Sequence, residues 1–231
     1  MAPPPARATL PLLLSLNAGY VDAAGFLALQ GLFTAHVTGN FVTLGAALAL
    51  GTSGVFAKLL ALPVFCAVVI AARLLGTLLA NRAAAAFEIL TGLKVLLLAV
   101  GAVLAIHFGP FHDGDSIQAV VTGMVLVAAM AIQNAVHRVH LSSAPPSTLM
   151  TGTTTQVMLD LADRIYPRKG LEPQPPARLI QMSTNIIVFA IGCGAAALLF
   201  TRIGVWCFVV PPVLAALSLI VRVAGSVNQR T

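Results

Sequence analysis

The chain has 231 residues, of which 58% are hydrophobic and only 9% are charged. A soluble domain carries about a quarter charged residues, so the composition excludes an ordinary water-soluble globular protein and indicates an all-α polytopic membrane protein. The net charge of +6 does not indicate a nucleic-acid partner, because the basic residues are scattered at the ends of apolar runs and form no basic face with interleaved aromatic residues.

Six apolar segments are long enough to cross a bilayer as helices, since each can span a hydrocarbon core of about 30 Å. The segments are residues 9–29, 55–81, 89–108, 117–138, 180–201 and 204–222. The first imitates a signal peptide, but its apolar run continues to Leu29 and further spans follow, so we expect an uncleaved helix. We therefore predict one membrane domain over residues 9–222, between a flexible N-terminus (1–8) and a C-terminal tail (223–231).

Two further segments are too short to cross. Residues 39–50 would form only about 18 Å of helix, and residues 152–164 about the same. The second, "GTTTQVMLDLADR", carries three threonines, a glutamine and two aspartates, which make a poor lipid-facing surface. We interpret both as re-entrant half-helices, which enter the membrane and leave it on the same side.

The sequence also contains an internal repeat. "AGYVDA" (18–23) and "HVTGNFVTLG" (36–45) correspond to the later "MAIQNA" (130–135) and "LMTGTTTQVM" (149–158). Asp22 and Asn134, which match in this alignment, are 112 residues apart, and "RLLGTLLANR" (73–82) corresponds to "CGAAALLFTR" (193–202). We therefore expect repeat 1 over residues 9–108 and repeat 2 over residues 117–222.

The orientation of the repeats depends on the short segments. If these re-enter, each repeat has three crossings and the second is inverted; if they cross, each has four and both point the same way. With a cytoplasmic N-terminus, re-entry places nine basic residues inside and only Lys58 and Arg202 outside, against eight and three for full crossing. The positive-inside rule thus favours re-entry, and the polarity and short length of residues 152–164 decide for the inverted repeat, with both termini in the cytoplasm.

Each short segment begins at a Thr-Gly motif, and we predict that the two motifs bind substrate. The predicted substrate-binding residues are Thr38, Gly39, Asn40, Thr151, Gly152 and Thr153, together with Asn134. Glycine would permit a sharp turn near the midplane, and Thr38 or Asn40 would cap the free N–H groups. Helix N-termini attract anions, and paired broken helices are a common plan for transporter sites. The alternative is that both motifs are only helix caps in a compact bundle.

Asp22 and Arg73 are the predicted ion-coupling residues. Asp22 lies two-thirds along the first span, where an unpaired charge is costly, and its counterpart Asn134 cannot ionise. This asymmetry suits proton coupling; alternatively, both side chains only form hydrogen bonds to neighbouring helices. Arg73 lies deep in the span 55–81, where it can meet Asp22, bind an anionic substrate or extend to the interface. Lys94 lies nearer a span end, and we expect it to extend to the interface.

Residues 18–49, "AGYVDAAGFLALQGLFTAHVTGNFVTLGAALA", resemble the YoaK family, uncharacterised bacterial membrane proteins with a domain of unknown function. The combination "VDAxGF…HVTGN" is specific, and the resemblance extends over nearly the whole chain, including "QNA…LMTGT". It implies an inner-membrane protein with about six helices and brings no established substrate. Arg73 departs from the small or apolar residue expected there.

We therefore expect a small-solute secondary transporter, proton-coupled, with a small anionic substrate and no cofactor. Its partners would be the lipid bilayer and the solute, and the sequence leaves a homo-oligomer open. A non-transporting assembly or sensory protein is the alternative. An intramembrane enzyme is less favoured, because the sequence has no G-x-S-x-G and no H-E-x-x-H motif. The three cysteines lie in or beside apolar runs without C-x-x-C spacing, so we expect neither a disulfide nor a metal site.

Overall fold

The structure is a computed structural model that describes residues 5–79, 83–166 and 174–227, and every regular element in these ranges is a helix. The α-helices in chain order are α1 (Pro5–Ala28), α2 (Asn40–Leu50), α3 (Val55–Leu78), α4 (Ala83–Phe108), α5 (Ile117–His140), α6 (Met150–Ile165), α7 (Pro176–Ile203) and α8 (Val210–Val227); η1 (Val37–Gly39) and η3 (Gly204–Val209) are 3-10 helices. The predicted all-α fold is confirmed.

Apolar helices make the chain a polytopic membrane protein. Five stretches of the described residues are long and apolar enough to cross a bilayer, and the last of them joins α7, η3 and α8. The stretches are Thr9–Ala28, Val55–Leu78, Ala85–Phe108, Ile117–His140 and Pro176–Ala224. Large apolar side chains point outward from them, such as Leu74 (58% exposed) and Leu78 (83%), and lipid is the solvent that suits such a surface.

The helical region extends beyond the predicted domain boundaries. Helix α1 already begins at Pro5, inside the predicted flexible N-terminus, and α8 continues to Val227, inside the predicted tail. Residues 1–4 and 228–231 lie outside the described residues.

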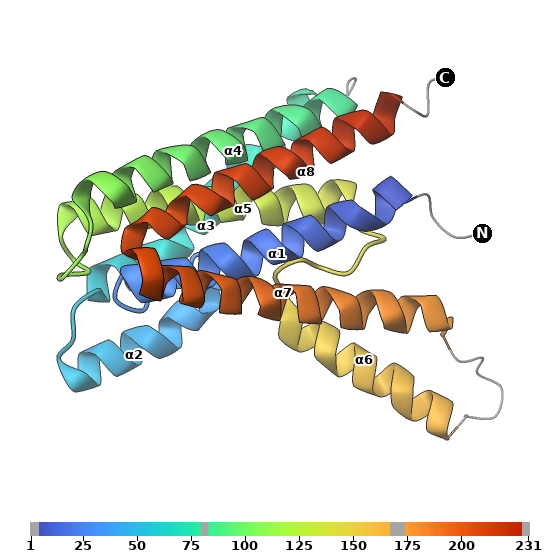
Figure 1. The fold of residues 1–231 in the computed structure, drawn as a ribbon, viewed down its shortest axis with the longest axis horizontal. Coiled ribbons are helices and arrows are strands. Elements are labelled where there is room, and N and C mark those ends of the chain that lie inside the picture. Colours follow the sequence, from blue (N-terminus) through green and yellow to red (C-terminus); the bar gives the residue numbers. More distant parts are fainter. Residues whose placement is uncertain (1–4, 80–82, 167–173, 228–231) are drawn as a thin grey trace.

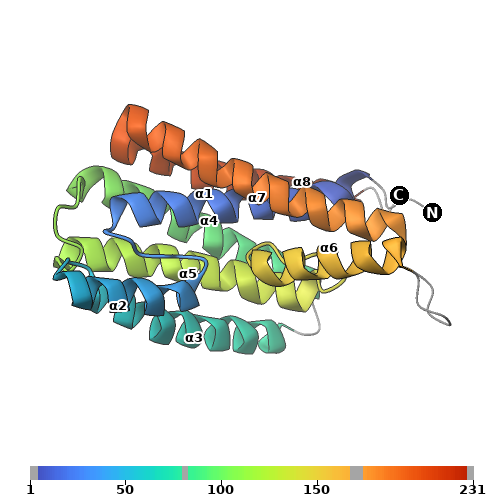
Figure 2. The ribbon, with the colours of Figure 1, turned by 90° about the horizontal axis from the view of Figure 1, so that it is seen from below.

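The two halves of the chain interleave. Helix α1 packs against α7 and α8, whereas α5 packs against α3 and α4 (Figures 1 and 2). Helices α1 and α7 approach closely because both carry glycine at the contact. A Cβ atom at Gly19 would lie 2.2 Å from the carbonyl oxygen of Phe189, and one at Gly192 would lie 2.3 Å from that of Leu16. Fully buried residues of the core include Val21, Leu98, Leu126 and Met130.

After α1 the chain enters the bundle and leaves it at the same end. Gln30, which follows α1, donates from Nε2 to the carbonyl oxygen of Phe111 at 3.0 Å. Gly54, which follows α2, donates its N–H to Asp115 at 2.8 Å. Both acceptors belong to the loop between α4 and α5, so α2 returns to the end of the molecule from which the chain came.

The second half follows a corresponding route at the other end of the molecule. After α5 the chain turns back into the bundle, and α6 then runs outward to the end where α7 begins (Figure 1). Helices α2 and α6 thus diverge from the long helices in opposite directions (Figure 1).

Candidate functional site

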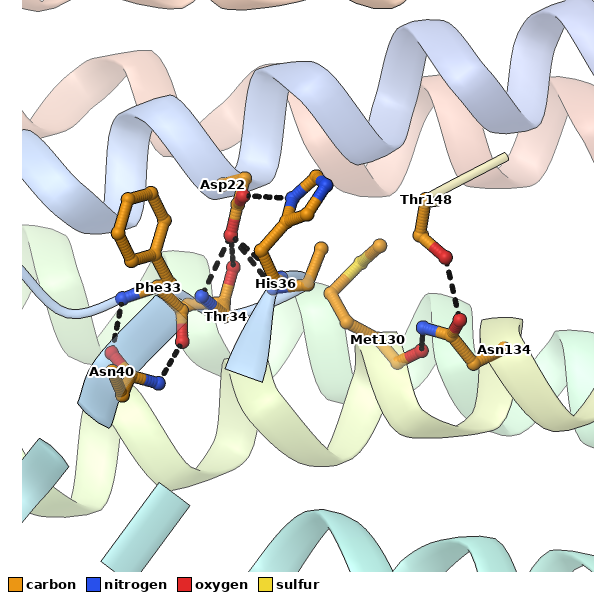
Figure 3. A network of polar contacts seen from close by, with 9 residues as sticks. Asp22, Phe33, Thr34, His36, Asn40, Met130, Asn134 and Thr148 are labelled. Carbon is orange, nitrogen blue, oxygen red and sulfur yellow. Dashed lines mark hydrogen bonds and ion pairs between the residues drawn. The ribbon is translucent and has the colours of Figure 1, made fainter. Parts of the chain in front are cut away.

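Asp22 is a buried carboxylate that binds the first non-helical segment, residues 29–36, between α1 and η1. Its side chain lies on α1 and faces residues 34–36 (Figure 3), and the residue is 3% exposed. Atom Oδ1 accepts the backbone N–H groups of Thr34 (2.8 Å), Ala35 (2.7 Å) and His36 (3.4 Å). Atom Oδ2 lies 2.7 Å from Nδ1 of His36, whose ring packs edge-on against Phe189 of α7. Hydrogen bonds to a carboxylate are about twice as strong as neutral ones, so Asp22 holds this segment against α1.

Asn40 ties the start of α2 to the same segment. Its Nδ2 donates to the carbonyl oxygen of Phe33 and its Oδ1 accepts the N–H of Phe33, both at 2.8 Å (Figure 3). The predicted capping role is wrong, because no side chain caps the start of α2 and Thr38 is exposed. The amide of Asn40, which is 1% exposed, instead closes the turn that leads into α2.

The glycines of the Thr-Gly motifs do not supply an unusual backbone angle, contrary to prediction. Gly39 has φ −62° and ψ −23°, which any residue adopts, and Gly152 lies inside α6. Positive φ occurs instead at Gln30 (54°) and Gly31 (83°), where the chain leaves α1. Gly39 matters sterically, because a Cβ atom there would lie 3.0 Å from the ring of Phe33.

Asn134 on α5, which the predicted repeat pairs with Asp22, contacts the second non-helical segment, residues 141–149. Its Oδ1 accepts the hydroxyl of Thr148 at 2.6 Å, and its Nδ2 donates to the carbonyl oxygen of Met130 (Figure 3). Asn134 and Thr148 are 14 residues apart, as are Asp22 and His36. The neutral amide forms fewer bonds to its segment than the carboxylate of Asp22 does.

Gln133 and Asn185 hold the second segment from α5 and α7. Gln133 donates from Nε2 to the hydroxyl oxygen of Ser147 at 3.2 Å, and Asn185 donates from Nδ2 to the carbonyl oxygen of Pro146 at 3.0 Å. Asn185 also accepts the hydroxyl of Ser15 on α1 at 2.7 Å. Non-helical backbone inside a membrane protein needs such internal partners, because lipid offers none.

Lys94 is a buried lysine, so its predicted position at the interface is wrong. It is 1% exposed, and its Nζ donates to Oε1 of Gln133 at 3.1 Å rather than extending to the interface. The reason is the length of α4, which begins at Ala83 instead of residue 89 and so places Lys94 three turns inside the helix. Within the described part of the chain, no carboxylate pairs with its ammonium group.

A pocket of about 280 Å³ lies between the second segment, α6 and α7. Its lining includes Gly152, Thr153, Gln156, Arg178 and Gln181. Nε of Arg178 lies 3.7 Å from Oδ2 of Asp160, which is 3% exposed, so the positive charge of Arg178 is partly balanced. The pocket therefore offers amide groups and one guanidinium group to a small polar solute.

The threonine hydroxyl groups of α6 form hydrogen bonds to backbone carbonyl groups at the start of the same helix and just before it. Thr153, Thr154 and Thr155 each donate to the carbonyl oxygen four residues earlier, at 2.8 to 3.0 Å. This bonding lets the exposed Thr154 and Thr155 face lipid without unpaired donors. Of the predicted motif, Gly152 and Thr153 line the pocket, whereas Thr151 is exposed and does not.

Arg73 does not pair with Asp22, which excludes the first of the three roles left open for it. The side chain that contacts Asp22 is that of His36, and its only signal in the sequence is its place two residues before Thr38. Arg73 is exposed, and its charge acts, together with that of Arg222, on His140 at the end of α5.

A family model and a known relative match this chain. Residues 10–221 match a family model described as "Protein of unknown function (DUF1275)". The chain is also 34% identical, over 169 residues, to the UPF0700 transmembrane protein YoaK of Bacillus subtilis (strain 168), a match that covers 71% of each chain. No solved structure matches the chain.

Proposed function

The chain belongs to the DUF1275 family, and because that family's description assigns no activity, we propose from the chain's own geometry that it is a small-solute secondary transporter. One observation carries the proposal: two short helices start inside the bundle, each after a non-helical segment held by a polar residue of a long helix. Such backbone is tolerated at membrane depth where it is buried in protein or lines a cavity, and broken helices of this kind form transporter sites.

The helix contacts support an inverted repeat as the basis of this site. The pairing of α1 with α7 corresponds to that of α5 with α3, and the pairing of α1 with α8 to that of α5 with α4. The contacts of α2 with α3 and of α6 with α7 correspond in the same way. A two-fold relation between residues 9–108 and 117–222 would produce all three correspondences, with the opposed directions of α2 and α6 (Figure 1).

Asp22 and His36 are the groups through which we expect proton coupling. Asp22 is buried, while the side chain of His36 is 33% exposed, so a proton can reach the pair through His36. Protonation of Asp22 would weaken its bonds to the backbone of residues 34–36 and release the segment that leads into α2. Asn134 cannot ionise, and its segment would stay in place while the first one moves.

The pocket beside Arg178 supports a small anionic substrate. Its volume of about 280 Å³ limits the solute to a small molecule, and Gly152 and Thr153 near the start of α6 belong to its lining. A helix N-terminus and a guanidinium group both favour an anion. We place the protein in the bacterial inner membrane with both termini in the cytoplasm, in agreement with the distribution of basic residues in the sequence.

The test is uptake by the purified protein in liposomes with an imposed pH gradient, using a panel of labelled small organic and inorganic anions. Asp22→Asn should keep the fold, because an amide oxygen still accepts backbone N–H groups. It should abolish pH-driven uptake and leave anion exchange without a gradient intact. If no anion of the panel moves in the wild type, transport of small anions is refuted; if pH-driven uptake survives in Asp22→Asn, Asp22 does not carry the proton.

A second candidate function is a non-transporting membrane assembly or sensory protein. It is favoured by the way both networks are satisfied within the chain: Asp22 bonds to its own loop, and Asn40 is 1% exposed. A cysteine at Asn40 distinguishes the two candidates. In a transporter it should react with a water-soluble thiol reagent as the segment opens, whereas in a static bundle it should stay protected.

A further inference from the structure

Arg222 and His140, from two different helices, both contact the aromatic ring of Phe87. The guanidinium carbon of Arg222 on α8 lies 4.9 Å from the ring centroid of Phe87. The ring of His140 at the end of α5 meets the same ring edge-on, with 5.6 Å between centroids. Arg73 on α3 adds its charge, because both arginines act electrostatically on His140. The two arginines therefore place positive charge beside His140 and Phe87, in a cluster built from α3, α4, α5 and α8.

No acidic side chain balances this cluster among the described residues. Glu88 follows Phe87 directly on α4, yet neither Arg73 nor Arg222 forms an ion pair with it or with another described carboxylate. Positive groups held close together repel each other unless an anion lies between them. The cluster is thus complementary to an anion that the protein itself does not supply.

The depth of the cluster indicates where that anion comes from. Arg73 and Arg222 each lie five residues before the last residue of their helices, which is about 7.5 Å of helix. A long arginine side chain can extend over that distance to the headgroups at the membrane interface. Helices α3 and α8 both end on this side, so the two arginines can reach the same interface.

We propose that Arg73, Arg222 and His140 bind a phosphate group, which an anionic phospholipid headgroup supplies at the membrane interface. Guanidinium groups bind phosphate oxygens in a bidentate manner, and a histidine N–H can add a further bond. Phe87 is 1% exposed and fixes the orientation of Arg222 by stacking, so the site is preformed on one side. The proposal is independent of transport.

The test uses the full chain, purified from vesicles of equal phosphatidylglycerol and phosphatidylcholine, with the retained lipid counted by native mass spectrometry. The wild type should retain phosphatidylglycerol in preference. Arg73→Gln and Arg222→Gln should each lower that preference about fivefold. Arg73 is exposed, so its substitution leaves the packing intact even where Arg222→Gln disturbs the stacking on Phe87. Arg202→Gln, an exposed arginine in the last turn of α7 at the opposite end, is the matched control and should change nothing.

A second arm distinguishes the two sources of phosphate. Inorganic phosphate is added to lipid-free protein in detergent, and thermal unfolding is followed. If phosphate alone stabilises the wild type but not Arg73→Gln, and no lipid preference is found, the site is real and its ligand is a soluble phosphate. Equal retention of both lipids with no phosphate effect overturns the proposal. A loss in Arg202→Gln as large as that in Arg73→Gln overturns it as well, since only net charge would then matter.

Discussion

Asp115 stabilises a helix to which it does not belong. From the loop before α5, its carboxylate accepts the N–H groups of Gly54 (2.8 Å), Val55 (3.0 Å), Phe56 (2.7 Å) and Ala57 (3.3 Å) at the start of α3. Burial by itself would raise the pKa of Asp115, but the four hydrogen bonds outweigh burial and hold this pKa below its usual value. The stabilisation is therefore present at neutral pH and is lost as the pH falls through the folded-state pKa.

Asp115→Asn should lower the free energy of unfolding by about 1 kcal/mol at neutral pH, because it removes a negative charge from a helix N-terminus. It should also flatten the loss of stability on acidification. Thermal unfolding in detergent over a pH series measures both effects. Asp113→Asn is the control, because the side chain of Asp113 accepts one N–H, that of Asp115, which an amide oxygen also accepts. An equal loss in the two variants would contradict the capping role.

The contact between Lys94 and Gln133 should show strong energetic coupling. Gln133→Leu leaves a buried ammonium group without its acceptor and should cost about 3 kcal/mol. Lys94→Met should cost much less, because methionine fills a similar volume without a charge. The double variant should recover part of the loss caused by Gln133→Leu, and a double-mutant cycle on unfolding free energies measures that coupling. A double variant that is no more stable than Gln133→Leu would show that Lys94 does not depend on this amide.

At the scale of elements, the start of α2 depends on packing against Phe33. Gly39→Val would bring its side chain into the ring of Phe33, whereas a Cβ atom at Gly45 has no neighbour within 4 Å. Overpacking of this kind costs about 1–3 kcal/mol, so Gly39→Val should lower the melting temperature and Gly45→Val should not. The more tolerant variant Gly39→Ala should lie between them. Equal melting temperatures for the two valine variants would mean that the ring of Phe33 moves aside freely.

At the scale of the whole molecule, the direction of α2 decides the topology. Thr52 and His112 are exposed and belong to two loops that Gly114 and Ser53 join by a 3.0 Å hydrogen bond. Single cysteines at Thr52 and His112, in a variant without native cysteines, should therefore react with an impermeant thiol reagent from the same side of the membrane. A cysteine at Ser142, after α5, should react from the opposite side. Labelling of positions 52 and 112 from different sides would exclude re-entry.

The sequence by itself determined the helical membrane class and the presence of the two short segments. These features follow from length, hydropathy and spacing, which are local properties and survive whatever the helices later pack against. The predicted helix boundaries were less accurate. Helix α4 begins at Ala83 instead of residue 89, and Lys94 is therefore buried instead of lying at the interface.

Only the tertiary structure decided which side chains meet. His36 instead of Arg73 pairs with Asp22, because the chain turns back against α1 directly after Gly31. Lys94 meets Gln133 across 39 residues of sequence, a contact set by how α4 packs on α5. Such pairings depend on helix rotation and approach, which hydropathy does not encode, and a buried charge takes whichever partner the packing brings within hydrogen-bond distance.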